Sequence, residues 1–212
     1  MRPRRIDRED RTMFRDITRD DVYRIETQRL WLRWPKLTDA PAIANALADR
    51  RISDMTSRIP HPYPDEHAEA FIYSTRESNH NGTALGLVIT PKQKPNSVIG
   101  AISLTSVEDN PKNLVIGYWI AATQWEKGFG SEAAISMVQT GFSLSKAEII
   151  DATVKPENTA SKRILAKIGF QEVGRESRFA PARQREEVID CFRITRVDWR
   201  NGGAWSGFGA AA

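Results

Sequence analysis

A strand-like run that leads into a glycine-containing turn and then a helix most constrains how this chain can fold. Residues 114–120 (LVIGYWI) have the apolar character of a buried strand, and residues 125–131 (WEKGFGS) follow where a helix with an apolar face begins. Such a turn places main-chain N–H groups at a helix N-terminus, where they favour an anion. An isolated Gly-x-Gly usually marks an ordinary turn, so its meaning depends on the neighbouring elements.

A second segment of the same type follows about thirty residues later. Residues 148–154 are strand-like and precede residues 158–170 (NTASKRILAKIGF), which have helical spacing. Asn158 is a natural helix N-cap, and Gly169 is typical of a left-handed helix stop. Together the two segments predict strand, glycine turn, helix, strand and Asn-led helix in this order.

This order resembles the acetyl-coenzyme A site of the GNAT superfamily. Four segments are similar to the ribosomal-protein-alanine N-acetyltransferase branch of it: TQRLWLR (27–33), DEHAEAF (65–71), GYWI (117–120) and PENTAS (156–161). The resemblance implies an α/β (α+β mixed) fold, with a central mixed, largely antiparallel sheet that is splayed at a bulge and flanked by helices. It covers residues 26–200.

Periodicity alone also predicts a mixed α/β sheet. Further strands are expected at about 30–34, 84–90, 98–106, 171–178 and 188–197. One helix is expected to be capped by Thr38 or Asp39, and a second by Asp65. We expect an N-terminal arm at 1–24 that is mobile or ordered by a partner, a catalytic domain at 25–200, and a flexible tail at 201–212.

The cofactor interpretation assigns the main chain of Gly128 to Ser131 to a pyrophosphate, because glycine allows close backbone approach, and Lys127 adds a charge. The resemblance implies that the Ile120 N–H meets the thioester carbonyl, that Asn158 contacts the pantetheine arm or a catalytic water, and that Ser161 lies near the sulfur. The expected cofactor contacts are Ile120, Lys127, Gly128, Phe129, Gly130, Ser131, Asn158 and Arg163. The expected catalytic groups are Asn158, Ser161 and the Ile120 main chain.

Structural explanations stand beside these roles. Asn158 can be only a cap, Ser161 only a surface hydroxyl, and Arg163, like Lys162, only a solvated cation. Core packing on alternate faces is the favoured interpretation of Tyr118 and Trp119.

Two positions depart from the family pattern. Trp125 stands where Gln or Arg usually opens the turn, and Leu165 stands where many members carry a tyrosine that protonates the thiolate. Ser161, a water or a tyrosine from elsewhere must therefore serve as the acid.

The general base is left open by the sequence. An amine must lose a proton before it attacks a thioester, and the candidates are Asp151, Glu132, His61 and His67. Glu132 also suits the helix dipole, and His67 suits a solvated helix face.

Composition limits the compartment and the partners that we expect for this chain. The chain has 212 residues, a net charge of +4 and one cysteine, Cys191, which excludes an internal disulfide framework. Its cations are interleaved with acids, so direct nucleic-acid binding is not expected. It has no apolar run of about 20 residues and no metal-ligand spacing, so we expect a cytoplasmic protein without a membrane partner or a metal.

The sequence thus predicts transfer of an acetyl group from acetyl-CoA, as co-substrate, to a primary amine by direct attack in a ternary complex. A protein N-terminal amine, ribosomal or other, is the favoured acceptor. The alternatives are a small-molecule amine acetyltransferase and a non-catalytic acyl-CoA-binding module. A homodimer is possible.

Overall fold

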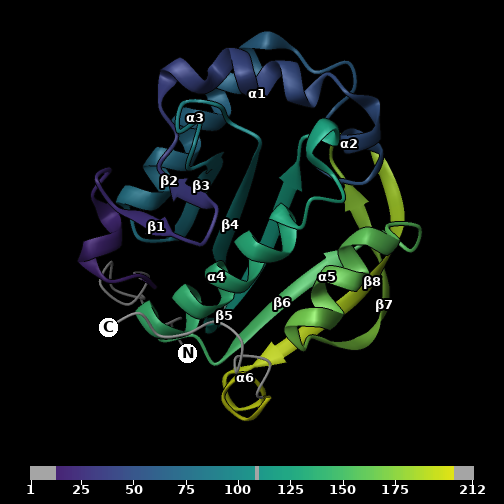
Figure 1. Ribbon diagram of the computed structural model, residues 1–212. Helices are drawn as coiled ribbons and strands as arrows, with labels where there is room; N and C mark the ends of the chain where they lie inside the picture. The colour runs from purple at the N-terminus through teal and green to yellow at the C-terminus, as the bar shows by residue number, and fades with distance from the viewer. Residues whose placement is uncertain (1–12, 108–109, 203–212) are drawn as a thin grey trace, which may run out of the picture.

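The computed structural model describes residues 13–107 and 110–202, which form an eight-stranded sheet with helices on both faces (Figure 1). The strand order is β1-β2-β3-β4-β5-β6-β8-β7. Only β5 and β6 are parallel among these neighbours, so the predicted mixed, largely antiparallel sheet is confirmed. The strands are β1 (Arg24–Glu26), β2 (Leu30–Arg33), β3 (Ala84–Pro91), β4 (Gly100–Val107), β5 (Asn110–Ile120), β6 (Ile149–Val154), β7 (Gln171–Ala180) and β8 (Arg185–Thr195).

Helices occur between the strands and after the last one. The α-helices are α1 (Ala40–Leu47), α2 (Arg50–Asp54), α3 (Asp65–His80), α4 (Phe129–Leu144), α5 (Thr159–Ile168) and α6 (Arg196–Asn201). The short 3-10 helices are η2 (Asp16–Arg19), η3 (Leu37–Asp39) and η4 (Ala122–Gln124). The sequence predicted α1, α3, α4 and α5 but not α2 and α6, which are too short to show a clear apolar period.

Two apolar cores cover the two faces of the sheet. Met137 of α4 and Leu165 of α5 are fully buried on one face, and Ile43 of α1 and Ile72 of α3 are fully buried on the other. Each such side chain stabilises the fold by about 1.5–3 kcal/mol. Because successive strand residues point to opposite faces, the end of β5 contributes to both cores.

β5 and β6 separate along their length, as the resemblance implied. Their ladder runs from Asn113 to Val115 on β5, and beyond it the two strands diverge toward the end of the sheet near α2 (Figure 1). The register shift in this region lies elsewhere, between Ser106 and Val107 on β4, whereas β5 pairs with β4 continuously from Leu114 to Ile120. The splay therefore follows from the course of β6 rather than from a bulge beside Ile120.

The chain packs on the domain from Met13 onward, earlier than the expected boundary at residue 25. Met13 and Phe14 are buried in the core under α4, and Phe14 forms a bridge with Ser145. Residues 1–12 of the expected arm and 203–212 of the expected tail lie outside the described residues.

Candidate active site

The end of β5 directs a main-chain N–H away from its antiparallel neighbour. The Ala121 N–H donates to the Ile99 carbonyl at 2.8 Å, so Ile120, one residue earlier, turns its N–H and carbonyl to the β6 side. The Trp125 indole donates to the Ile120 carbonyl at 2.7 Å and ties the following turn to this strand end. The Ile120 N–H thus points to the side on which β6 has diverged.

The glycine turn has the backbone expected of an anion site. Gly128 adopts φ 77°, and α4 begins at the next residue. The Glu132 N–H donates to the Gly128 carbonyl at 3.1 Å, so the N–H groups of Phe129, Gly130 and Ser131 precede the first intrahelical hydrogen bond. These donors, with the positive end of the helix dipole, can hold a pyrophosphate.

Arg29 contacts this turn, and this role was not predicted from the sequence. Its Nη1 donates to the Lys127 carbonyl at 2.9 Å, and its guanidinium lies over the Phe129 ring at 4.7 Å. Its Nε and its main-chain N–H both donate to the Glu132 carboxylate at 2.7 Å. Arg29 therefore brings a cation to the turn and neutralises an acid that would otherwise repel an anion.

Thr27 completes this link between the first strands and α4. Its hydroxyl donates to Glu132 at 2.6 Å. Burial alone would raise the pKa of Glu132, but the hydrogen bonds from Thr27 and Arg29 and the arginine charge outweigh it and lower that pKa. The pattern T-x-R at residues 27–29 is visible in the sequence, but it gives no signal of this role, because it meets the acid in the first turn of α4 only after folding.

Gly130 lets α4 approach α5 and the end of β5. A Cβ at this position would lie 3.0 Å from Ile164 Cδ1 and 3.6 Å from Ile120 Cγ1. The glycine is therefore needed for packing as well as for any backbone contact with an anion. A substitution here would disturb both.

The start of α5 brings two hydroxyl groups together. Asn158 caps the helix as predicted, because its side-chain oxygen accepts from the Ser161 N–H at 3.0 Å. The Ser161 hydroxyl lies 2.9 Å from the Tyr118 hydroxyl of β5. Burial raises the pKa of Tyr118 to about 12, although the bond to Ser161 lowers it in part. Tyr118 and Trp119 pack against the cores on opposite faces, as expected, and the Tyr118 hydroxyl also joins β5 to α5.

The two expected basic contacts, Lys127 and Arg163, and the neighbouring Lys162 are placed differently from one another. Arg163 is exposed on α5. Lys127 folds back on the turn, with its Nζ 3.1 Å from the Thr123 carbonyl and 3.1 Å from Gln124 Oε1. Lys162 forms an ion pair with the fully buried Asp190, so its charge serves the fold rather than a phosphate.

Two of the four candidate bases are held by hydrogen bonds from neighbouring side chains. Glu132 is held by Arg29 and Thr27. Asp151 accepts two hydrogen bonds from Arg193, at 2.7 and 2.9 Å, and one from Asn113 at 2.8 Å. His67 is exposed on α3 and packs edge-on against Tyr63, with 5.9 Å between the ring centroids, and His61 is exposed in the α2–α3 loop.

Comparisons with known proteins agree with this geometry. The model of the family described as Acetyltransferase (GNAT) domain matches residues 29–171, more than half of the chain. The chain belongs to the GNAT acetyltransferase family. It is 28% identical over 170 residues to a Bacillus licheniformis protein named Uncharacterized N-acetyltransferase p20, covering 80% of this chain and 93% of that one.

Solved acetyltransferases share the fold of this GNAT chain. The ribosomal-protein-S5-alanine acetyltransferase from Vibrio fischeri has a TM-score of 0.71 at 21% identity, over 84% of this chain and 98% of that one. The microcin C7 self-immunity acetyltransferase MccE, in complex with acetyl-CoA and AMP, has a TM-score of 0.67 at 19% identity, over 79% and 93%.

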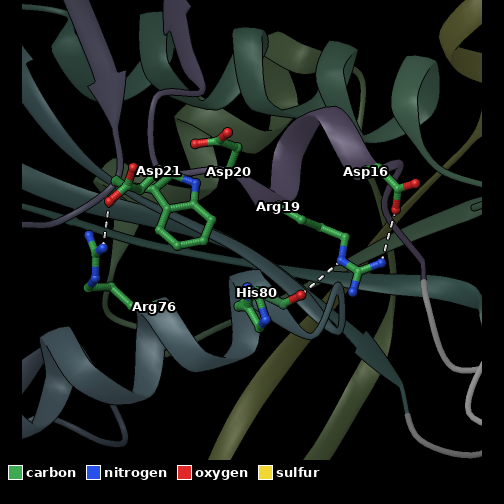
Figure 2. Close-up of a pocket in the computed structure, with 7 residues that line it drawn as sticks. Asp16, Arg19, Asp20, Asp21, Arg76 and His80 are labelled. Carbon is green, nitrogen blue, oxygen red and sulfur yellow. Dashed lines mark hydrogen bonds and ion pairs between the residues drawn. The ribbon is translucent and has the colours of Figure 1, made fainter.

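A cavity of about 590 Å³ in this GNAT domain is lined by residues of η2, of the turn after it and of α3, together with Trp34 (Figure 2). Its charged groups bond to one another: Arg19 to Asp16 at 3.0 Å and to the His80 carbonyl at 2.8 Å, and Arg76 to Asp21 at 2.7 Å. These contacts tie η2 and the turn after it to α3, which is a structural role. Its lining residues are Asp16, Arg19, Asp20, Asp21, Trp34, Arg76 and His80.

Two further properties concern only residues 13–107 and 110–202 of the GNAT chain. Within these ranges no three His, Cys, Asp or Glu side chains are grouped closely enough to hold a metal ion. None of the helices there has both the length and the apolar character needed to cross a bilayer.

Proposed function

We propose that this chain transfers the acetyl group of acetyl-CoA to a primary amine, with a protein or peptide N-terminal amine as the favoured acceptor. The proposal is supported by three kinds of group near the diverging end of β5: the Ile120 N–H, the amides that open α4, where Gly130 faces Ile120, and the Ser161 hydroxyl, which contacts Tyr118 of β5. These groups match the three parts of an acyl-CoA: carbonyl, pyrophosphate and sulfur.

The chemistry follows from these placements. The amine nitrogen attacks the thioester carbon, and the carbonyl electron pair moves to oxygen, where the Ile120 N–H stabilises it. One donor of this kind contributes roughly 2.7–4 kcal/mol. The carbonyl then re-forms, the carbon–sulfur bond breaks with its electron pair on sulfur, and the nitrogen gives its extra proton to water.

The hydrogen bonds that hold the candidate bases favour an N-terminal amine as the acceptor. Glu132 and Asp151 are held by arginines, so no strong base is evident among the candidates. An α-amino group has an ordinary pKa of about 7.7–8.0, whereas lysine has about 10.4, so the former supplies far more neutral amine near pH 7. The likeness to the Vibrio fischeri enzyme, whose name specifies a ribosomal-protein alanine, is a further reason for this choice.

An acceptor screen tests the proposal. Acetyl-CoA and the purified chain are mixed with a peptide that has a free N-terminus, with the same peptide blocked there but carrying lysine, and with free small amines, and thiol release is followed. We expect the unblocked peptide to react fastest. Preference for free small amines would establish the small-molecule alternative, and acetyl-CoA binding without thiol release would establish the non-catalytic one.

A further inference from the structure

We propose that Tyr118 is a positioning residue for the leaving sulfur: its phenol fixes the Ser161 hydroxyl so that Ser161 donates a hydrogen bond to the departing thiolate of coenzyme A. The inference rests on the proposed function and adds a residue to it. It also accounts for the chain's departure from the tyrosine pattern, since Leu165 is fully buried in the core and has no proton to give.

The contact is held from both sides. Ser161 is fixed on α5 because its N–H donates to the Asn158 side chain at 3.0 Å, and Tyr118 is fixed on a strand that pairs continuously with β4. The two hydroxyl oxygens are 2.9 Å apart. A phenol is a stronger acid than an aliphatic alcohol and so is the better donor. With Tyr118 donating, the Ser161 proton is directed to a third atom.

The magnitude of the pKa excludes Tyr118 as the source of the proton itself. Burial raises the pKa of Tyr118 to about 12, whereas a thiol such as that of cysteine has an ordinary value of about 8.5. Transfer from this phenol to the thiolate would be uphill by more than three powers of ten. A fixed hydrogen bond requires no such transfer, and both hydroxyl groups keep their protons.

The step therefore balances without a proton from the pair. The carbon–sulfur bond breaks, both electrons go to sulfur, and coenzyme A leaves as a thiolate that accepts the Ser161 hydrogen bond. The proton lost by the attacking nitrogen goes to water. Tyr118 touches neither the sulfur nor the amine and acts only through Ser161.

Bound coenzyme A gives a readout that needs no acceptor. A hydrogen bond to the thiolate lowers the pKa of the bound thiol, which is measured from the ultraviolet absorbance of the thiolate during a pH titration. We expect this pKa to be higher in Tyr118→Phe and in Ser161→Ala than in the wild type, by about one pH unit, with no further rise in the double variant. Turnover should fall by about tenfold in each single variant, again without addition in the double, while KM for acetyl-CoA changes little.

A second partly buried tyrosine provides the matched control. The Tyr23 hydroxyl is hydrogen-bonded to Thr140 of α4, so Tyr23→Phe removes a similar bond away from the strand end and should leave thiol pKa and turnover unchanged. An equal thiol pKa in wild type and Tyr118→Phe, with coenzyme A bound to both, would overturn the role of Tyr118 and leave the proposed function standing. Failure of the wild type to bind coenzyme A would overturn both. Additive losses in the double variant would assign Tyr118 to the fold alone.

Discussion

Arg29 and Glu132, 103 residues apart in the sequence, meet through two hydrogen bonds of 2.7 Å, one from the arginine side chain and one from its main chain. The pair links the start of β2 to the first turn of α4. A carboxylate near a helix N-terminus competes with a bound anion, and the arginine offsets that charge. The charge at the glycine turn therefore depends on a residue that is distant in the sequence but adjacent in the fold.

The first prediction concerns this arginine. Arg29→Met should weaken binding of coenzyme A about tenfold or more, because it removes a cation and exposes the Glu132 charge to the pyrophosphate. Calorimetric titration measures the change. Lys112→Met is the matched control, since it removes an equal charge that pairs with Glu148 near the start of β5 rather than near the turn. Recovery of affinity in Arg29→Met/Glu132→Gln would show that the exposed acid, rather than a lost phosphate contact, caused most of the effect.

Low pH should remove the stability that Glu132 contributes to the folded domain. Its pKa is lowered in the folded state, so its contribution to stability is present above the unfolded value of about 4.3 and is lost as pH falls through the folded value. Glu132→Gln should be less stable than the wild type near neutral pH and should lose less stability below about pH 4.3. Urea unfolding at several pH values measures this difference. Glu69→Gln, at an exposed position on α3, is the control, and parallel pH curves for wild type and Glu132→Gln would contradict the prediction.

Substitutions at Asn158 distinguish a helix-capping role from a contact with the pantetheine arm. Asp caps a helix about as well as Asn, so Asn158→Asp should keep the stability of the wild type, whereas Asn158→Ala should lose about 1 kcal/mol. If the amide also contacts pantetheine, Asn158→Asp should lower turnover despite its stability. Thermal unfolding and thiol release, measured on the same samples, distinguish these results. Full turnover in Asn158→Asp would return the residue to a purely structural role.

The pH dependence of the rate should follow the acceptor amine. For a peptide with a free N-terminus, kcat/KM should rise with pH and level off above about pH 8, whereas a lysine acceptor should keep gaining rate toward about pH 10. No falling limb should arise from Tyr118 in this range, because its pKa of about 12 keeps the hydroxyl protonated. Initial rates in overlapping buffers measure the profile. A peptide profile that levels off well below the ordinary α-amino pKa of about 7.7–8.0 would contradict this assignment.

Local signals predicted the parts of the site that are local in the sequence. Gly128 opens α4 in the left-handed region, and Asn158 caps α5, because turn and cap preferences act over a few residues. The family pattern likewise predicted the divergence of β5 and β6. Contacts between distant segments were missed: Arg29 with Glu132, and Tyr118 with Ser161, depend on how β2, β5 and two helices pack. The same reason explains why Lys162, which has a plausible charge and position, pairs with a buried aspartate instead.

The short ladder between β5 and β6 has a mechanical consequence. Strands β1 to β5 form one part of the sheet and β6 to β8 another. The main-chain ladder that joins the two parts is short: it runs from Asn113 to Val115, with one further hydrogen bond from the Glu148 N–H to the Lys112 carbonyl at 2.8 Å. An elongated ligand bound between the free edges of β5 and β6 would take the place of a missing strand and hold the two parts of the sheet together. Slower amide hydrogen exchange at residues 116–120 and 152–154 in the presence of coenzyme A would show this stabilisation. The cofactor would then be part of the folded structure as well as a reactant.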